Sequence, residues 1–381
     1  MSADPKARMG LVVPGLGHLL TGDVKNGVGM LLELGVLLLA LVLGLPRIGS
    51  LLFPDASAGG FALHPWVALL SWFGFAALLW YFARQHAQPD KNVSRENQSQ
   101  WQLVWRQFKK NRMGVIGLHC VVLLAMVTLL TPFLAPHDPD LLDVGPQKSS
   151  PSLSFLMGTD EFGRDMLSRL LYGARISLSI GFLAVVISGT FGAIWGAMSG
   201  YFGGRVDTVM VWLTDFMLSM PRLVLVLTIV GLFRPSGAGG IYLIVLVLGL
   251  TGWMGVSRIV RGLVLSLKEQ DFIQAARALG QQPSIIILKH LIPNAIAPVI
   301  VHATLGVGNT ILTEAALSFL GLGVPPPIST WGSIVNDGRE FLRTLPWIAA
   351  FPGLLIVFAV TSFNMLGDGL RDALDPKLRS R

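Results

Sequence analysis

Eight long apolar stretches constrain the fold of this 381-residue chain more than any other feature. A helix needs about 20 mainly apolar residues to cross a bilayer, because each backbone N–H and C=O must find its partner within the segment. Over half of the residues are hydrophobic and only 13% are charged, which excludes an ordinary soluble protein of this length. We therefore expect an all-α integral membrane protein. The stretches cover residues 28–45, 61–82, 115–135, 176–201, 206–233, 241–260, 295–320 and 346–367.

The distribution of basic residues predicts how the chain is oriented. If the N-terminus is cytoplasmic, the segments on that side carry most of the Lys and Arg residues. The positive-inside rule then places both termini in the cytoplasm. The same distribution accounts for the net charge of +7, so the charge gives no reason to expect a nucleic-acid partner.

A polar stretch at residues 85–102 divides the chain into unequal parts. We expect an N-terminal extension with two transmembrane helices at residues 1–90 and a six-helix transmembrane domain at 113–381. Residues 91–112 are interpreted as a linker and an amphipathic helix at the membrane interface. The aromatic and apolar residues of that helix recur at helical spacing, at Trp101, Val104, Trp105 and Phe108.

Acidic and basic residues are dense between Thr159 and Arg169, in the predicted outer loop 136–174. Such a run can form a catalytic or metal cluster. Acids and arginines at these spacings can equally pair with one another and cap a helix that starts near Glu161. The second interpretation is the one we favour.

The cytoplasmic loop 266–293 carries the most informative pattern in the chain. Its four small or apolar residues at positions i, i+3, i+4 and i+7 predict one stripe on a short helix. Gly280 is placed to end that helix in the left-handed conformation, Pro283 suits the first turn of another helix, and Pro293 is expected to start the next span. The stripe consists of Phe272, Ala275, Ala276 and Leu279. The pattern alone fits either an ordinary interfacial loop or a helix that sits in the groove of a partner.

A resemblance to a known family favours the second of these alternatives, a helix that sits in the groove of a partner. The pattern Gln274-Ala275-Ala276-x3-Gly280-x11-Ile292-Pro293 resembles the cytoplasmic loop with which membrane subunits of ATP-binding-cassette importers dock on their ATPase. Gln274 departs from that loop, which most often has Glu at this position. The departure removes one charge and leaves the alanine face and the glycine break intact.

Five further motifs, in the same order, are similar to segments of the dipeptide/oligopeptide/nickel permease family. They lie at residues 158–178, 200–207, 316–323, 329–332 and 363–379. Within that family the chain resembles the subunit type that carries the GTDxxGRD segment. The resemblance covers residues from about Trp101 to Arg379 and leaves the N-terminal extension outside it.

The resemblance implies a permease subunit in a bacterial inner membrane. Its implied partners are a second homologous permease that completes the pore, two ABC ATPase subunits that bind ATP and Mg, and an extracytoplasmic solute-binding protein. The chain has no GxxxxGK[ST] phosphate loop, so we expect no ATPase site and no cofactor of its own. Relatives of this core carry dipeptides, longer peptides, nickel chelates or glutathione-like compounds, and the sequence does not choose among them.

Ionisable residues within the predicted spans are further candidates for function, since they normally face a partner or a water-filled path. Asp215 and Arg222 lie seven residues apart on one predicted helix face, with Pro221 between them, and can pair with each other or with the partner permease. Glu314 and Asp215 are each expected either to line or gate the path or to form a static bond between helices. Glu33, near the start of its span, is expected to reach back to the interface.

Two other classes of membrane protein remain as rivals. A secondary transporter would show internally repeated spans with interrupted helices, and the two halves of this sequence show no such similarity. A membrane-embedded enzyme would need converging polar residues within the spans, whereas the seven histidines are scattered.

Overall fold

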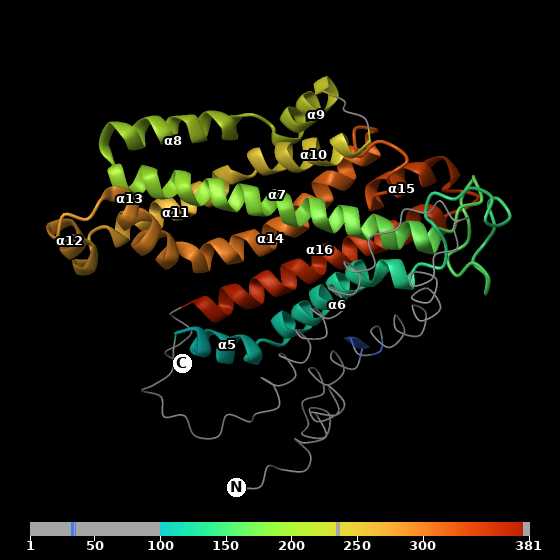
Figure 1. The fold of residues 1–381 in the computed structure, drawn as a ribbon, viewed down its shortest axis with the longest axis horizontal. Coiled ribbons are helices and arrows are strands. Elements are labelled where there is room, and N and C mark those ends of the chain that lie inside the picture. Colours follow the sequence, from blue (N-terminus) through green and yellow to red (C-terminus); the bar gives the residue numbers. More distant parts are fainter. Residues whose placement is uncertain (1–31, 34, 36–99, 234–236, 376–381) are drawn as a thin grey trace, which may run out of the picture. The chain divides into compact units, whose positions relative to one another are not determined.

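The computed structural model describes residues 32, 33, 35, 100–233 and 237–375, and within them every regular element is a helix (Figure 1). The all-α prediction is confirmed for this part of the chain. An isolated β-bridge joins Thr159 to Asp165 in the loop before α7. Apart from Leu32, Glu33 and Gly35, the predicted N-terminal spans at 28–45 and 61–82 lie outside the described residues.

The described helices provide up to six membrane spans, in agreement with the six-helix domain expected at 113–381. Five helices or continuous helix runs are long and apolar enough to cross a bilayer, and a bent pair supplies the sixth. In order along the chain, the helices are α5 (Gln100–Lys110), α6 (Arg112–Leu134), α7 (Met166–Phe202), α8 (Gly204–Ser219), α9 (Arg222–Phe233), α10 (Ala238–Leu250), α11 (Trp253–Leu267), α12 (Asp271–Ala278), α13 (Pro283–Ile285), α14 (Ile292–Phe319), α15 (Trp331–Gly338) and α16 (Trp347–Leu374).

The predicted span 206–233 is not one straight helix. It is divided into α8 and α9, whose axes differ by 81°. The break contains Pro221, which has no backbone N–H to donate and whose ring crowds the preceding turn. The hydropathy pattern located this span correctly but could not indicate the size of the bend.

The start of α7 also differs from the prediction. The helix begins at Met166 rather than near Glu161, because Asp165 caps it by accepting hydrogen bonds from the backbone N–H and the Oγ of Ser168. The neighbouring Asp160 accepts from Arg164 Nε at 2.6 Å and from Arg169 Nη1 at 2.8 Å. Mutual pairing and capping therefore account for this dense run of charges.

The chain divides into two compact units. Unit 1 comprises Met1–Arg175, Phe341–Phe351 and Thr361–Ala373, and unit 2 comprises Ile176–Glu340, Pro352–Val360 and Leu374–Arg381.

In unit 1, α6 packs closely against the end of α16. A Cβ on Gly117 would lie 2.5 Å from the backbone nitrogen of Leu366, so only glycine allows the two helices to approach this far. Asn111 caps α6 by accepting from the backbone N–H of Gly114, and its side chain donates to Asp372 at 2.7 Å.

Glu33 contacts the same unit, and the prediction that it reaches the interface is wrong. Its side chain is buried, and its Oε1 lies 2.8 Å from Nδ1 of His119 on α6. The imidazole supplies a polar partner at this depth, so the carboxylate need not extend to the membrane surface.

In unit 2, three glycines spaced four residues apart let α7 approach α11. A Cβ on Gly192 would lie 2.5 Å from the carbonyl oxygen of Trp253, and one on Gly200 would lie 2.9 Å from Cγ1 of Val264. Gly196 faces the carbonyl of Ser257 in the same way. The backbones of these two helices thus meet without intervening side chains, which places the C-terminal end of α7 beside that of α11.

Candidate functional site: the loop 266–293 and polar groups within the spans

The loop between α11 and α14 is folded into two short helices. α12 begins at Asp271 in a run of good helix formers, and the side chain of Gln274 donates back to the carbonyl of Lys268 at 3.0 Å. The helix ends at Ala278, and Gly280 follows its C-cap with a φ of 73°, which confirms the predicted left-handed conformation. The N–H of Gln281 bonds to the carbonyl of Ala276 and that of Gly280 to the carbonyl of Arg277, which together form a Schellman motif.

Of the four residues in the predicted stripe on α12, only Ala276 lies on the buried face. Ile273 and Ala276 point into the protein, whereas Phe272 and Leu279 are 42% and 82% exposed. Ala275 is exposed as well. The helix therefore has two apolar faces, and the outward one is defined here as the docking face: Phe272, Ala275 and Leu279. Gln274 is also exposed and lies on the same short helix.

Ile273 anchors the loop in the protein, and the sequence pattern missed it. It is fully buried, and its spacing of three from Ala276 was a usable signal that the longer run at 272, 275, 276 and 279 obscured. Because this inward face is apolar, α12 is held to the membrane helices by packing rather than by its connections alone.

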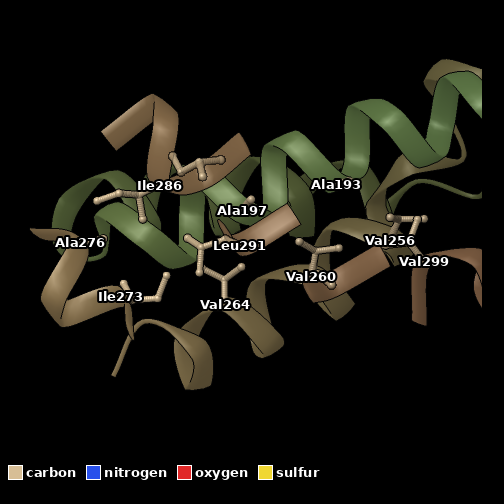
Figure 2. Packing of buried hydrophobic residues seen from close by; sticks show 12 residues of the cluster. Ala193, Ala197, Val256, Val260, Val264, Ile273, Ala276, Ile286, Leu291 and Val299 are labelled. Atoms are coloured by element: carbon tan, nitrogen blue, oxygen red, sulfur yellow. The ribbon is translucent and has the colours of Figure 1, made fainter. Parts of the chain in front are cut away.

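A buried apolar cluster fixes the loop to three membrane helices (Figure 2). It contains residues from α7, α11, α12, the π-helical segment Ile286–Leu291 and the start of α14. Lys268 Nζ adds a hydrogen bond to the carbonyl of Gly200 at 3.2 Å, and the guanidinium of Arg277 lies 4.8 Å from the ring centre of Tyr201. The cluster consists of Ala193, Ala197, Val256, Val260, Val264, Ile273, Ala276, Ile286, Ile287, Leu291, Ala295 and Val299.

The connection from the loop to α14 is continuous. Pro283 occupies the first turn of α13 as predicted, and Pro293 lies in the first turn of α14. A π-helical segment, Ile286–Leu291, joins the two helices without a break, which the sequence did not predict. The N–H of Ile292 bonds to the carbonyl of Ile287, and this wider turn accommodates Pro293, which has no N–H for the regular pattern.

Asp215 and Arg222 do not pair with each other, because the bend between α8 and α9 separates their helix faces. Asp215 instead accepts from Arg258 Nη2 on α11 at 2.6 Å. Arg222 Nη2 donates to the carbonyl of Leu248 at 3.3 Å, and its buried Nε has no hydrogen-bond partner among the described residues.

A second ion pair lies nearer the loop end of the same two helices. The carboxylate of Asp207 accepts from both Nε and Nη2 of Arg261, each at 2.6 Å. The pair is less exposed than Asp215 and Arg258 and was not among the residues predicted from the sequence. The sequence signal that could have identified this pair is one acidic and one basic residue in neighbouring spans.

Glu314 forms hydrogen bonds between helices. Of the two roles expected for it, this is the static bond rather than the lining of a path. The carboxylate is fully buried and accepts from Ser318 Oγ at 2.8 Å and from Ser177 Oγ on α7 at 3.3 Å. Ser177 Oγ in turn accepts from the backbone N–H of Trp331 at the start of α15. This network joins α7, α14 and α15 at the end of unit 2 away from the loop. Among the described residues, no three His, Cys, Asp or Glu side chains converge as metal ligands would.

Comparison with known proteins identifies two matching families. Residues 192–380 match the family described as the inner membrane component of binding-protein-dependent transport systems. Residues 99–152 match the N-terminal transmembrane domain of oligopeptide transport permease C.

Individual relatives match over most of both chains. The dipeptide transport system permease protein DppC of Alkalihalophilus pseudofirmus is 40% identical over 74% of this chain and 91% of its own. The oligopeptide transport system permease protein OppC of Bacillus subtilis is 38% identical over 78% of this chain and 96% of its own. OppC of Escherichia coli K12 is 41% identical over 74% of this chain and 93% of its own.

Proposed function

The chain belongs to the family of inner membrane components of binding-protein-dependent transport systems, and from this we propose that it is the permease subunit of an ATP-driven importer of peptides. The observation that carries the proposal is the similarity to dipeptide and oligopeptide permeases over nearly their full length. The membrane-spanning helices and the folded loop 266–293 support it.

The docking face of α12 is the proposed contact with the ATPase subunits. Its three residues are exposed, apolar and raised on a helix whose other side is anchored in the buried cluster. An exposed apolar surface beside polar residues is typical of a protein contact. Because α12 is packed against α11 and the start of α14, a displacement of the ATPase would move these helices with it.

The remaining parts of the transporter are supplied by partners. A second, homologous permease would complete the pore, two ATPase subunits would bind ATP and Mg, and an extracytoplasmic binding protein would deliver the solute. This chain would bind no cofactor and catalyse no reaction. We place both of its termini in the cytoplasm, on the basis of the excess of Lys and Arg in the segments on that side.

The docking proposal is tested by placing a charge on the docking face. In Ala275→Asp and Leu279→Asp the new carboxylate lies on the docking face, so the permease should fold and reach the membrane normally. Both variants should lose the ATPase subunits on purification, and with them peptide-stimulated ATP hydrolysis. Gln274→Glu should be tolerated, since the loop that this segment resembles most often has Glu at this position.

Ala276→Asp is the matched contrast, because Ala276 is buried in the cluster rather than on the docking face. A buried unpaired charge should lower the amount of folded permease itself. If Ala275→Asp and Leu279→Asp retained the ATPase subunits at the wild-type ratio, this loop would not be the docking element.

The transport proposal needs a separate measurement. Proteoliposomes that contain the whole complex and its binding protein should accumulate a labelled dipeptide or oligopeptide when ATP is present. Uptake of neither peptide by a complex that hydrolyses ATP would contradict the peptide assignment.

A further inference from the structure

The ion pair between Asp215 and Arg258 is exposed within the membrane-spanning part of unit 2. Their side chains are 52% and 59% exposed, although their atoms approach to 2.6 Å. Asp215 lies about 17 Å along α8 from Gly204, and Arg258 lies about 14 Å along α11 from Leu267, at 1.5 Å per residue. A hydrocarbon core is about 30 Å thick, so if the loop ends of α8 and α11 mark its cytoplasmic edge, both groups lie near its middle.

An exposed charge pair at this depth does not face lipid. Ionisable groups within membranes face the protein interior or a water-filled path, because exposure to hydrocarbon is costly for each of them. The pair between Asp207 and Arg261 lies on the same two helices, closer to the cytoplasmic loop. Polar groups thus extend from the loop end of α8 and α11 towards the middle of the membrane.

Aromatic rings lie beside the exposed pair on α8. Trp212 and Phe216 are 63% and 48% exposed, and their rings stack with centroids 5.8 Å apart. Trp212 lies three residues before Asp215 and four before Phe216, so its ring neighbours both the carboxylate and the second ring on the surface of α8. The region therefore combines a positive group, a negative group and an apolar platform.

We propose that this surface of α8 and α11 lines the solute path and that Asp215 and Arg258 form a transient subsite for the charged ends of a zwitterionic peptide. The guanidinium of Arg258 would receive the terminal carboxylate, and the carboxylate of Asp215 would receive the terminal ammonium group. Trp212 and Phe216 would contact apolar side chains of the peptide. The inference rests on the proposed peptide-import function.

The geometry suits a site that must release its ligand. In the absence of a peptide the two residues satisfy each other, so neither charge is left unpaired. An exposed ion pair contributes little net stability, and a peptide with two free ends can exchange with it at low cost. The peptide carboxylate would replace the carboxylate of Asp215, and the peptide ammonium group would replace the guanidinium of Arg258. Every charge therefore keeps a partner of opposite sign during binding and release.

Cysteine labelling tests whether the surface faces water. In a Cys120→Ala background, the reconstituted complex would carry either Trp212→Cys or Phe182→Cys. Phe182 is 60% exposed on α7, in the same unit, and serves as the matched control on an apolar surface. A membrane-impermeant thiol reagent should label the Trp212→Cys variant and leave the Phe182→Cys variant unlabelled.

Protection from labelling tests the ligand. A tripeptide with free ends should slow labelling of the Trp212→Cys variant at least about fivefold more than the same tripeptide with blocked ends, because the charged contacts are lost on blocking. Adding Arg258→Gln should abolish this difference, and Arg258→Lys should restore part of it. Retention of the ATPase subunits by each variant shows that it has folded and assembled.

Uptake of labelled tripeptide by the wild-type complex is measured in parallel. If uptake occurs but the Trp212→Cys variant is unlabelled, or if both tripeptides protect it equally, the surface is a contact with the second permease or with lipid and the inference is wrong. If the wild type takes up no peptide, the proposed function itself has failed.

Discussion

Two parallel N–H···O hydrogen bonds, each 2.6 Å long, join the guanidinium of Arg261 on α11 to the carboxylate of Asp207 on α8. The side chain of Ser199 on α7 also donates to Asp207, so three membrane helices meet at one carboxylate. The geometry depends on the planar fork of arginine, since the ammonium group of lysine cannot form both bonds in parallel.

Replacing Arg261 with lysine should therefore be costly although the charge is kept. We expect Arg261→Lys to lower the free energy of unfolding by about 1 to 2 kcal/mol, as for a lost charge-assisted hydrogen bond at a partly exposed site. Arg258→Lys is the control, because its pair is more than half exposed and has one hydrogen bond at 2.6 Å. Thermal unfolding of the purified complex in detergent measures the stability of both variants, and equal unfolding midpoints would contradict the expectation.

The packing of α7 on α11 should depend on Gly192. The Cβ of Gly192→Ala would lie 2.5 Å from the carbonyl oxygen of Trp253, so the helices must separate. We expect a loss of about 1 to 3 kcal/mol, typical of overpacking. Gly189→Ala lies one turn earlier on the same helix with nothing within 4 Å of the new Cβ, and should be neutral or slightly stabilising. A destabilised Gly189→Ala variant would show that helix separation is not the cause.

Gly280 should tolerate no side chain even though the space around it is open. Nothing lies within 4 Å of a Cβ at this position, but its φ of 73° costs an L-residue about 1 to 2 kcal/mol. Gly280→Ala should loosen the end of α12, detectable as faster amide hydrogen exchange at residues 276–281. Gly262→Ala is equally open and lies within α11, so exchange in the loop should stay at the wild-type rate.

Glu314 should be replaceable by glutamine but not by alanine. The amide of Glu314→Gln keeps an oxygen that can accept from Ser318 or Ser177, whereas Glu314→Ala removes the acceptor and leaves a buried cavity. We expect Glu314→Ala to cost about 2 to 5 kcal/mol and Glu314→Gln markedly less. The melting temperatures of the two variants decide this. If they fell equally, hydrogen bonding to this side chain would not hold α7, α14 and α15 together.

Much of the fold could be predicted from the sequence because hydrocarbon imposes a simple requirement. A helix that crosses the bilayer needs a long apolar run, so the six spans in the region 113–381 were visible without any contact information. The angles between elements depend on contacts and were not visible. The 81° bend between α8 and α9 is set by local packing around Pro221, and proline alone specifies a break but no angle.

The candidate site was predicted in part for a similar reason. Gly280 was identified because a left-handed residue at a helix end has a strong sequence signal. Ala276 was placed on the outward face because the longer apolar run through Phe272 and Leu279 obscured its spacing of three from Ile273. Which apolar residues of a short helix are buried depends on the elements packed against it, and the pattern within the helix does not contain that information.

The π-helical segment Ile286–Leu291 has a consequence for how this loop can vary in evolution. A hydrogen bond from residue i to residue i+5 encloses one residue more than a regular turn, so the segment is equivalent to a single-residue insertion in an otherwise regular helix. Deleting one residue there would restore regular turns and rotate α12 by about 100° around the axis of α14. Ile273 and Ala276 would then leave their positions against α7 and α11. A length change that most surface loops absorb would therefore displace the whole of α12 at this one.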